Sequence, residues 1–288
     1  FTSATQFNPA AGLNLFSALC GTIAIFMSYQ IAATLAHKLQ SREKTNIDGW
    51  QNPLFLLMFA AAGCHTSLNN ALRAEVYYPT FLMISICLYL ALKTSESELN
   101  SKRYPLLIAF IVGLGAGLHH LTIFLTVPAL FILINSGNNW RSYKNRIPLW
   151  ISAFILGASV TLYIPIRYAA GSNYFWGDPS SFDGFLGIIF ASDFGIPSGS
   201  LSPSHLIAAF SFSINLIYEQ IGIFGIIGAI IGIRWLYKLN VRYAFGMAAL
   251  ITANCISIIF FEQYFYEYQD LHGYLLPSVG ISFVLTAL

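Results

Sequence analysis

The feature of this sequence that most limits its fold is a succession of long apolar runs separated by polar connectors. The first run spans 13–36, and others follow as far as 279–288. A helix of about 20 apolar residues crosses about 30 Å of hydrocarbon and satisfies its own backbone hydrogen bonds there. Only 9% of the residues are charged, against about 25% in an ordinary soluble domain. The sequence therefore predicts an all-α integral membrane protein.

Basic residues concentrate in alternate connectors. Twelve of the fourteen Lys and Arg residues lie in four of them: Lys38, Arg42, Lys44, Lys93, Lys102, Arg103, Arg141, Lys144, Arg146, Arg234, Lys238 and Arg242. The other two, Arg73 and Arg167, lie in the intervening connectors. Cytoplasmic loops carry an excess of Lys and Arg. This alternation predicts a helical bundle of about eight spans plus the start of another at Leu275, with the N-terminal segment outside.

The apolar run 106–134 has a His pair near its middle, His119 and His120. Imidazoles at the centre of a bilayer are costly, so we predict two shorter spans that meet at this pair. On a helix the two rings diverge by about 100°, which argues against one shared metal ion. The glycines before the pair allow close helix packing; they are Gly113, Gly115 and Gly117.

The longest connector, 168–205, contains the turn-forming stretch Trp176-Gly-Asp-Pro179. A short amphipathic helix is predicted over 181–190, with Ser180 or Ser181 as its N-cap. By the charge alternation this connector lies on the outer or lumenal face. The whole of 1–288 is expected to be a single transmembrane domain, cut at both ends because it starts at Phe1 and stops inside an apolar run.

The unusual polar residues all fall on that same predicted outer face, which suggests a shared water-filled cleft. They are Asn69, Asn70, Arg73, Glu75, His119, His120, Arg167, Asp178, Asp270 and His272. Because Arg73 and Glu75 are two residues apart, they cannot share a helix face, and we expect them to have different partners. Local capping or pairing by Glu75 is the alternative.

Arg167 follows Pro165 at the end of a span and has no acid near it in sequence. A guanidinium binds phosphate bidentately, although it can also extend to lipid headgroups. Asp178 can orient a sugar hydroxyl or brace Arg167. Aromatic residues beside acids in 265–274 suit either a carbohydrate or an interfacial aromatic belt.

Several chemistries are not indicated. The sequence has no phosphate-binding glycine loop, no zinc-ligand motif and no basic patch for nucleic acid. The four cysteines lie in or beside apolar runs, which is typical of small buried hydrophobes.

Four motifs occur in the order of a known family: Ala74-Glu-Val-Tyr77, Gly115-x-Gly-Leu-His-His-Leu-Thr122, Tyr163-x-Pro-x-Arg167 and Trp176-Gly-Asp-Pro179. From about Asn8 to its end, the chain resembles the domain-of-unknown-function family 2723, whose animal relatives are the transmembrane protein 260 type of protein O-mannosyltransferase. The resemblance implies a C-type glycosyltransferase fold and a donor sugar on a polyprenyl or dolichyl phosphate. It also implies a catalytic carboxylate in a first outer loop, which we expect upstream of Phe1, so that this fragment alone would be inactive. His120 matches the family histidine, whereas His119 stands where relatives often have Asn.

We therefore hypothesise a membrane glycosyltransferase that acts on the outer or lumenal face, in a bacterial inner membrane or the endoplasmic reticulum. Its partners would be the lipid-linked donor, an acceptor protein or glycan and the bilayer, but no nucleic acid. No cofactor is assigned, although a divalent cation remains open. The predicted substrate-binding residues are Arg73, Glu75, Tyr77, His120, Arg167, Trp176, Asp178 and Asp270. The alternatives are a transporter or flippase of a lipid-linked substrate and a non-catalytic scaffold.

Overall fold

The computed structural model describes residues 9–43, 51–137, 143–172, 175, 177–190, 202–261, 264 and 266–288. Within these ranges the chain is helical and has no strand, so the all-α prediction is confirmed. The main helices are α1 (Pro9–Glu43), α2 (Gln51–Gly63), α3 (His65–Ala71), α4 (Tyr77–Lys93), α5 (Glu98–Ile134), α7 (Ile147–Ala158), α8 (Tyr163–Ala169), α9 (Phe182–Ile189), α10 (Pro203–Leu239), α11 (Val241–Ser257) and α12 (Gln269–Thr286).

Four described segments are long and apolar enough to cross a membrane, namely 10–42, 98–134, 144–169 and 203–239. Shorter apolar helices cover 54–63 and 77–93. These lengths and compositions are those of an integral membrane protein. The count of about eight spans stays a prediction.

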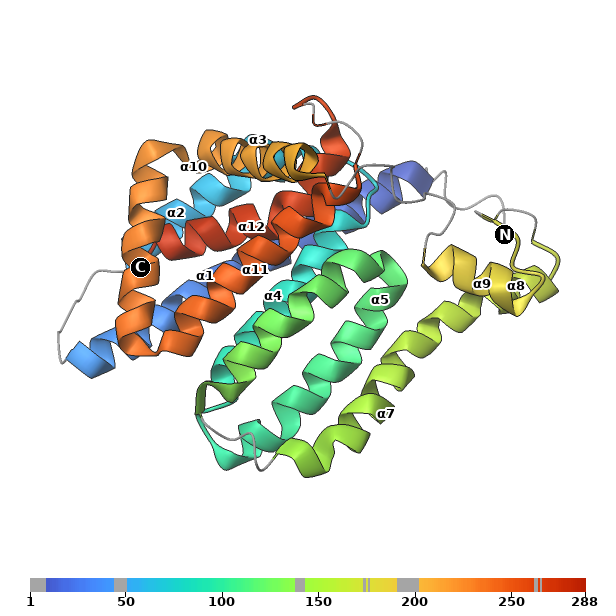
Figure 1. Cartoon of the computed structure of the whole chain (residues 1–288), viewed down its shortest axis with the longest axis horizontal. Coiled ribbons are helices and arrows are strands. Elements are labelled where there is room, and N and C mark those ends of the chain that lie inside the picture. The colour runs from blue at the N-terminus through green and yellow to red at the C-terminus, as the bar shows by residue number, and fades with distance from the viewer. Residues whose placement is uncertain are drawn as a thin grey trace, which may run out of the picture.

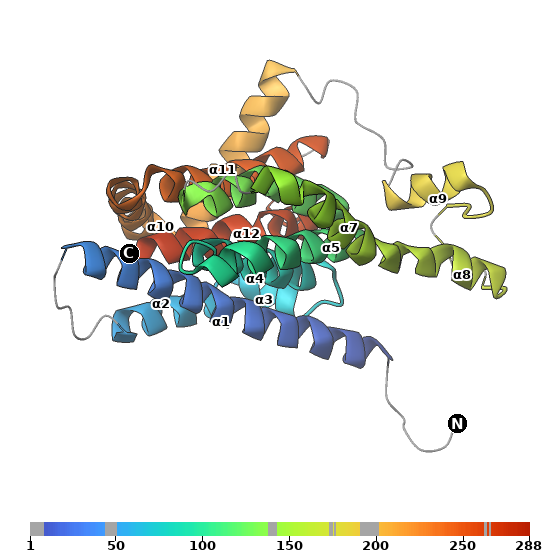
Figure 2. The same ribbon diagram turned by 90° about the horizontal axis from the view of Figure 1, so that it is seen from below.

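The centre of the bundle is α12, which is buried from Leu271 to Leu285 except at the half-buried Tyr274. Figure 2 shows it between α11 on one side and α4 on the other, with α1 beyond α4. Glycines permit the close approach of these helices. At Gly280, for example, a Cβ would overlap the ring of Phe81 in α4. This packing places the first turns of α12 beside the start of α4.

The backbone of α5 breaks at His119, where φ is −152° and ψ is 80°. The two arms fold back on each other (Figure 1), so that a Cβ at Gly115 would lie 2.8 Å from the Ile123 side chain. At Gly113, a Cβ would lie 2.1 Å from the backbone oxygen of Phe154 in α7. Both predictions for this segment, the break at the His pair and the packing role of the glycines, are confirmed.

A second break divides α10 at Gly222, whose φ of 66° lies in the left-handed region that glycine adopts without strain. The two arms of α10 run in different directions (Figure 1). Glu219 lies three residues before this turn, within the apolar run 206–235.

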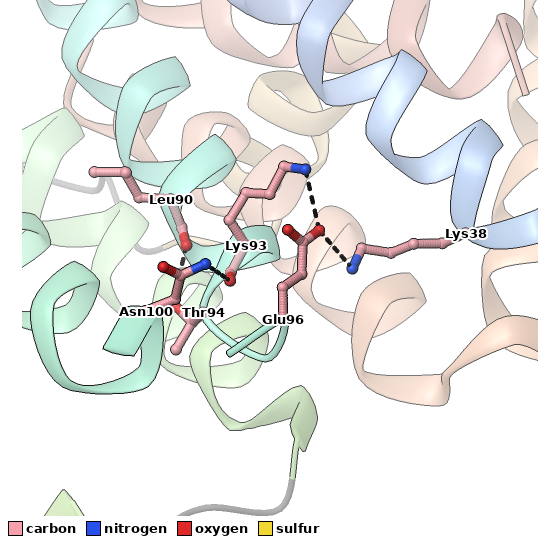
Figure 3. A network of polar contacts seen from close by, with 6 residues as sticks. All are labelled: Lys38, Leu90, Lys93, Thr94, Glu96 and Asn100. Carbon is pink, nitrogen blue, oxygen red and sulfur yellow. Dashed lines mark hydrogen bonds and ion pairs between the residues drawn. The ribbon is translucent and has the colours of Figure 1, made fainter. Parts of the chain in front are cut away.

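At the other end of α4, charged residues link neighbouring helices. The Glu96 carboxylate lies 3.1 Å from both the Lys38 ammonium of α1 and the Lys93 ammonium of α4 (Figure 3). Thr94 is buried there, and its hydroxyl donates to the Leu90 carbonyl at 2.9 Å.

Two arginines at this end donate hydrogen bonds to carbonyl groups at the C-terminal ends of helices. Arg42 donates to the carbonyls of Lys238 and Leu239 at the end of α10, and Arg242 donates to the carbonyl of Asn135 after α5. Cations are favourable at helix C-termini. Residues from several of the basic connectors therefore meet at one end of the bundle, opposite the start of α4.

Candidate functional site

Four of the eight predicted substrate-binding residues come together where α4 and α12 begin. The Arg73 guanidinium lies 3.2 Å from the Glu75 carboxylate and 3.9 Å from that of Asp270. Asp270 also interacts with the hydroxyl of Tyr77, the first residue of α4. We call Arg73, Glu75, Tyr77 and Asp270 the Arg73 group.

The prediction that Arg73 and Glu75 have different partners was wrong. Its premise was a helix, but α3 ends at Ala71 and α4 starts at Tyr77. Between them the Glu75 amide donates to the Arg73 carbonyl at 2.9 Å, which closes a three-residue turn. This turn puts the two side chains on the same side, and the alternative of local pairing by Glu75 is the one observed.

The Arg73 group retains unused hydrogen-bonding capacity. The Nη1 atom of Arg73 is buried and has no hydrogen-bond partner among the described residues, because 3.9 Å to Asp270 is too long for one. Two carboxylates facing one guanidinium give the group a net charge of −1. It therefore offers carboxylate oxygens that can accept from hydroxyls and one N–H that can donate.

Aromatic rings border the Arg73 group. The centroid of the Tyr77 ring lies 5.7 Å from that of Tyr274 and 5.8 Å from that of His119. His119 and Tyr274 make an edge-to-face contact at 4.5 Å. The Tyr77 ring fits there because the facing residue of α12 is Gly273, where a Cβ would overlap it. Polar groups beside aromatic rings suit a sugar, which has apolar faces and hydroxyl edges.

The break in α5 decides the hydrogen-bonding state of His119. The Thr122 amide donates to His119 Nδ1 at 3.4 Å. A nitrogen that accepts a hydrogen bond carries no proton, so the neutral ring has its hydrogen on Nε2. In that form Nε2 is the donor atom of His119, whose ring packs against Tyr77 and Tyr274.

His120, the residue predicted for the site, lies on the other side of this turn. Its ring contacts Phe190, just after α9, with 6.1 Å between centroids. The predicted site includes neither His119 nor Tyr274. The break at the His pair was the signal for His119, because a turn presents successive side chains to different neighbours.

Arg167 and Asp178 form a separate region around α8 and α9. Arg167 is exposed and lies 6.0 Å from the centre of the Tyr163 ring. Asp178 accepts from the Ser180 hydroxyl at 2.8 Å and from its amide at 2.9 Å, and these bonds lower the pKa of its carboxyl. Ser181 is the residue that caps α9.

Figures 1 and 2 show α8 and α9 away from the start of α12, so this region is separate from the Arg73 group. No ion pair connects Arg167 with Asp178 among the described residues. Trp176 lies outside the described residues. Within the described ranges, no three His, Cys, Asp or Glu residues are grouped so that they could hold a metal ion.

Residues 1–143 match the family model described as the protein O-mannosyl-transferase TMEM260 N-terminal domain. The predicted family resemblance is thus confirmed for residues 1–143, and for the rest of the chain it stays a prediction. The TMEM260 match includes Arg73, Glu75, Tyr77 and the His pair, but not Arg167, Asp178 or Asp270. No curated protein and no solved structure matches the chain.

Proposed function

We propose that this chain forms part of a membrane glycosyltransferase. It transfers a sugar from a polyprenyl or dolichyl phosphate to an acceptor hydroxyl, such as that of a protein Ser or Thr, on the outer or lumenal face. The TMEM260 match is to a domain named for protein O-mannosyl transfer, which favours mannose and a protein acceptor.

The Arg73 group is the observation that carries this proposal. Glu75 and Asp270 are acceptors for the hydroxyls of a sugar or an acceptor side chain, and Arg73 is paired with both carboxylates. Tyr274, which is half-buried, would cover the apolar face of a sugar ring, with Tyr77 packed beside it. The group lies at the opposite end of α4 from the Lys38, Lys93 and Glu96 cluster, which fits a site on the face away from the basic connectors.

The donor phosphate is best assigned to Arg167. Within the described residues this guanidinium has no carboxylate partner, whereas Arg73 has two. His120 and Asp178 lie on the side of α9 and would orient the donor. The adjacent His119 donates through Nε2 toward the reacting groups, where a fixed donor stabilises the oxygen on which charge develops. None of these residues is assigned as the general base.

The experiment is sugar transfer by the natural full-length protein in nanodiscs, with polyprenyl phosphate mannose as donor and Ser/Thr peptides as acceptors, with and without Mg²⁺. Asp270→Asn keeps the shape but removes a charge, and we expect at least about a tenfold loss of kcat/KM. Lys38→Gln is the matched control, because it removes one partner of a similar ion pair at the other end. Equal activity of the Asp270→Asn and Lys38→Gln proteins would refute the proposed site.

One observation favours the flippase alternative. Transporters often bind their substrates where helices are broken, and both α5 and α10 are broken. However, the break in α5 lies beside Tyr77 at the start of α4, and the two arms fold back instead of continuing in line. Proteoliposomes that move a lipid-linked sugar between leaflets but transfer none to peptides would favour the flippase.

A further inference from the structure

We infer that His272 is a positioning residue for the Arg73 group. It touches neither Arg73 nor Asp270 through its ring. Instead, it connects α12 to α3 and to the connector before α12, and thereby fixes where Asp270 stands relative to Arg73. The kinetic part of this inference rests on the proposed function, whereas the positional part does not.

The His272 side chain is completely buried, and both of its ring nitrogens are occupied. Nε2 lies 2.7 Å from the Tyr266 carbonyl oxygen, and Nδ1 lies 2.9 Å from the Thr66 hydroxyl. A carbonyl oxygen can only accept, so Nε2 carries the hydrogen. In the neutral ring Nδ1 then accepts from Thr66, which is also completely buried. Each polar atom of this buried link therefore has its partner.

The link joins the two elements that supply the Arg73 group. Thr66 lies in α3, which leads directly into the connector that carries Arg73. His272 lies in the first turns of α12, two residues after Asp270. The Thr66 amide also donates to Gln220 of α10 at 3.0 Å, so the start of α3 is held from two directions.

The Arg73–Asp270 pair cannot hold these elements by itself. Its side chains are 36% and 35% exposed and its atoms are 3.9 Å apart, and exposed pairs of this kind contribute little to stability. A buried imidazole, in contrast, is costly unless its hydrogen bonds are made. Loss of the Thr66 bond would release α3 from α12, and Arg73 would lose its fixed place opposite Asp270.

Thr66→Val tests this link because it removes the hydroxyl at nearly constant volume, while Thr66→Ser retains the hydroxyl. Thr94→Val is the matched control: Thr94 is equally buried, but its hydroxyl bonds the Leu90 carbonyl of the helix that it follows directly, at the other end of α4 (Figure 3). Spin labels at Leu72 and Tyr268, both exposed, report the distance between the Arg73 connector and the start of α12. They are introduced as cysteines in full-length protein without its native cysteines, and the distances are measured by pulsed electron resonance.

We expect a narrow distance distribution for the parent, Thr66→Ser and Thr94→Val proteins and a broader or shifted one for Thr66→Val. In the transfer assay, Thr66→Val should lower kcat about tenfold, as loss of one buried hydrogen bond can, and Thr66→Ser should restore most of it. An unchanged distribution in the Thr66→Val protein would overturn the inference. If the parent protein transfers no sugar, the proposed function fails, but the distance measurement still decides whether His272 positions the pair.

Discussion

The fit of Tyr77 against Gly273 gives the sharpest prediction about the architecture of the site. In Gly273→Ala, the added methyl would lie within 2.5 Å of three atoms of the Tyr77 ring, whereas carbon atoms pack at about 3.5 to 4 Å. The ring has no free space to move into, because Tyr77 is only 8% exposed and contacts both His119 and Tyr274.

Two opposing effects set the magnitude. Overpacking a core costs about 1–3 kcal/mol, while replacing Gly by Ala within a helix gains up to about 1 kcal/mol. We therefore expect Gly273→Ala to lower the free energy of unfolding by about 1–2 kcal/mol. Gly63→Ala in α2 is the matched control, since a Cβ there has nothing within 4 Å. That variant should keep or slightly raise the stability.

Reversible unfolding in detergent mixtures, followed by tryptophan fluorescence, measures both variants. Adding Tyr77→Ala to Gly273→Ala creates room for the methyl, so the two changes together should cost less than the sum of their separate effects. If Gly273→Ala is as stable as Gly63→Ala, or if its effect adds fully to that of Tyr77→Ala, then Gly273 does not pack tightly against the Tyr77 ring.

Three further predictions concern other parts of the chain. His119→Gln keeps a donor near the position of Nε2 and should retain most of the transfer activity, whereas His119→Phe keeps the aromatic contact but should lower kcat by about 10²-fold; the reverse order would mean that the ring only fills space. Arg42→Gln should reduce stability by about 1–2 kcal/mol in the same unfolding assay, because carbonyls at the end of α10 lose their donor; no change would show that water replaces it. Single cysteines at Ser180 and Ser95 should react with an impermeant maleimide from opposite sides of the membrane, and labelling of both from one side would overturn the topology.

The sequence predicted the helical class and the break in α5 because both follow from local chemistry. Apolar runs of sufficient length require helices, and a His pair in the middle of one requires an exit from the bilayer. It also selected Arg73, Glu75, Tyr77 and Asp270, although nothing in the sequence says that 73–77 and 270 meet. Their proximity depends on the packing of α4 against α12. These helices are far apart in the sequence, and Gly273 and Gly280 let them approach closely.

The errors have equally definite causes. The relation of Arg73 to Glu75 was argued from helix geometry, but the residues occupy a turn. His120 stays a predicted site residue, chosen by a family position; the different neighbours of the His119 and His120 rings depend on the local backbone at His119. Separation of Arg167 and Asp178 from the Arg73 group could not be foreseen either, because charge alternation predicts a shared side of the membrane and not a distance across it.

Under the proposed function, the two regions would divide the substrate according to charge. An anion that approaches the Arg73 group must compete with two carboxylates for one guanidinium. An anion that approaches Arg167 competes only with solvent and with the contact of this guanidinium with the Tyr163 ring. Hydroxyls have the opposite preference, because carboxylates accept from them strongly. His119 and His120 are consecutive, yet one ring contacts Tyr77 and Tyr274 while the other contacts Phe190 beside α9. The turn in α5 thus touches both regions, and in the proposed reaction a donor with its phosphate near α8 and its sugar near α12 would pass across it.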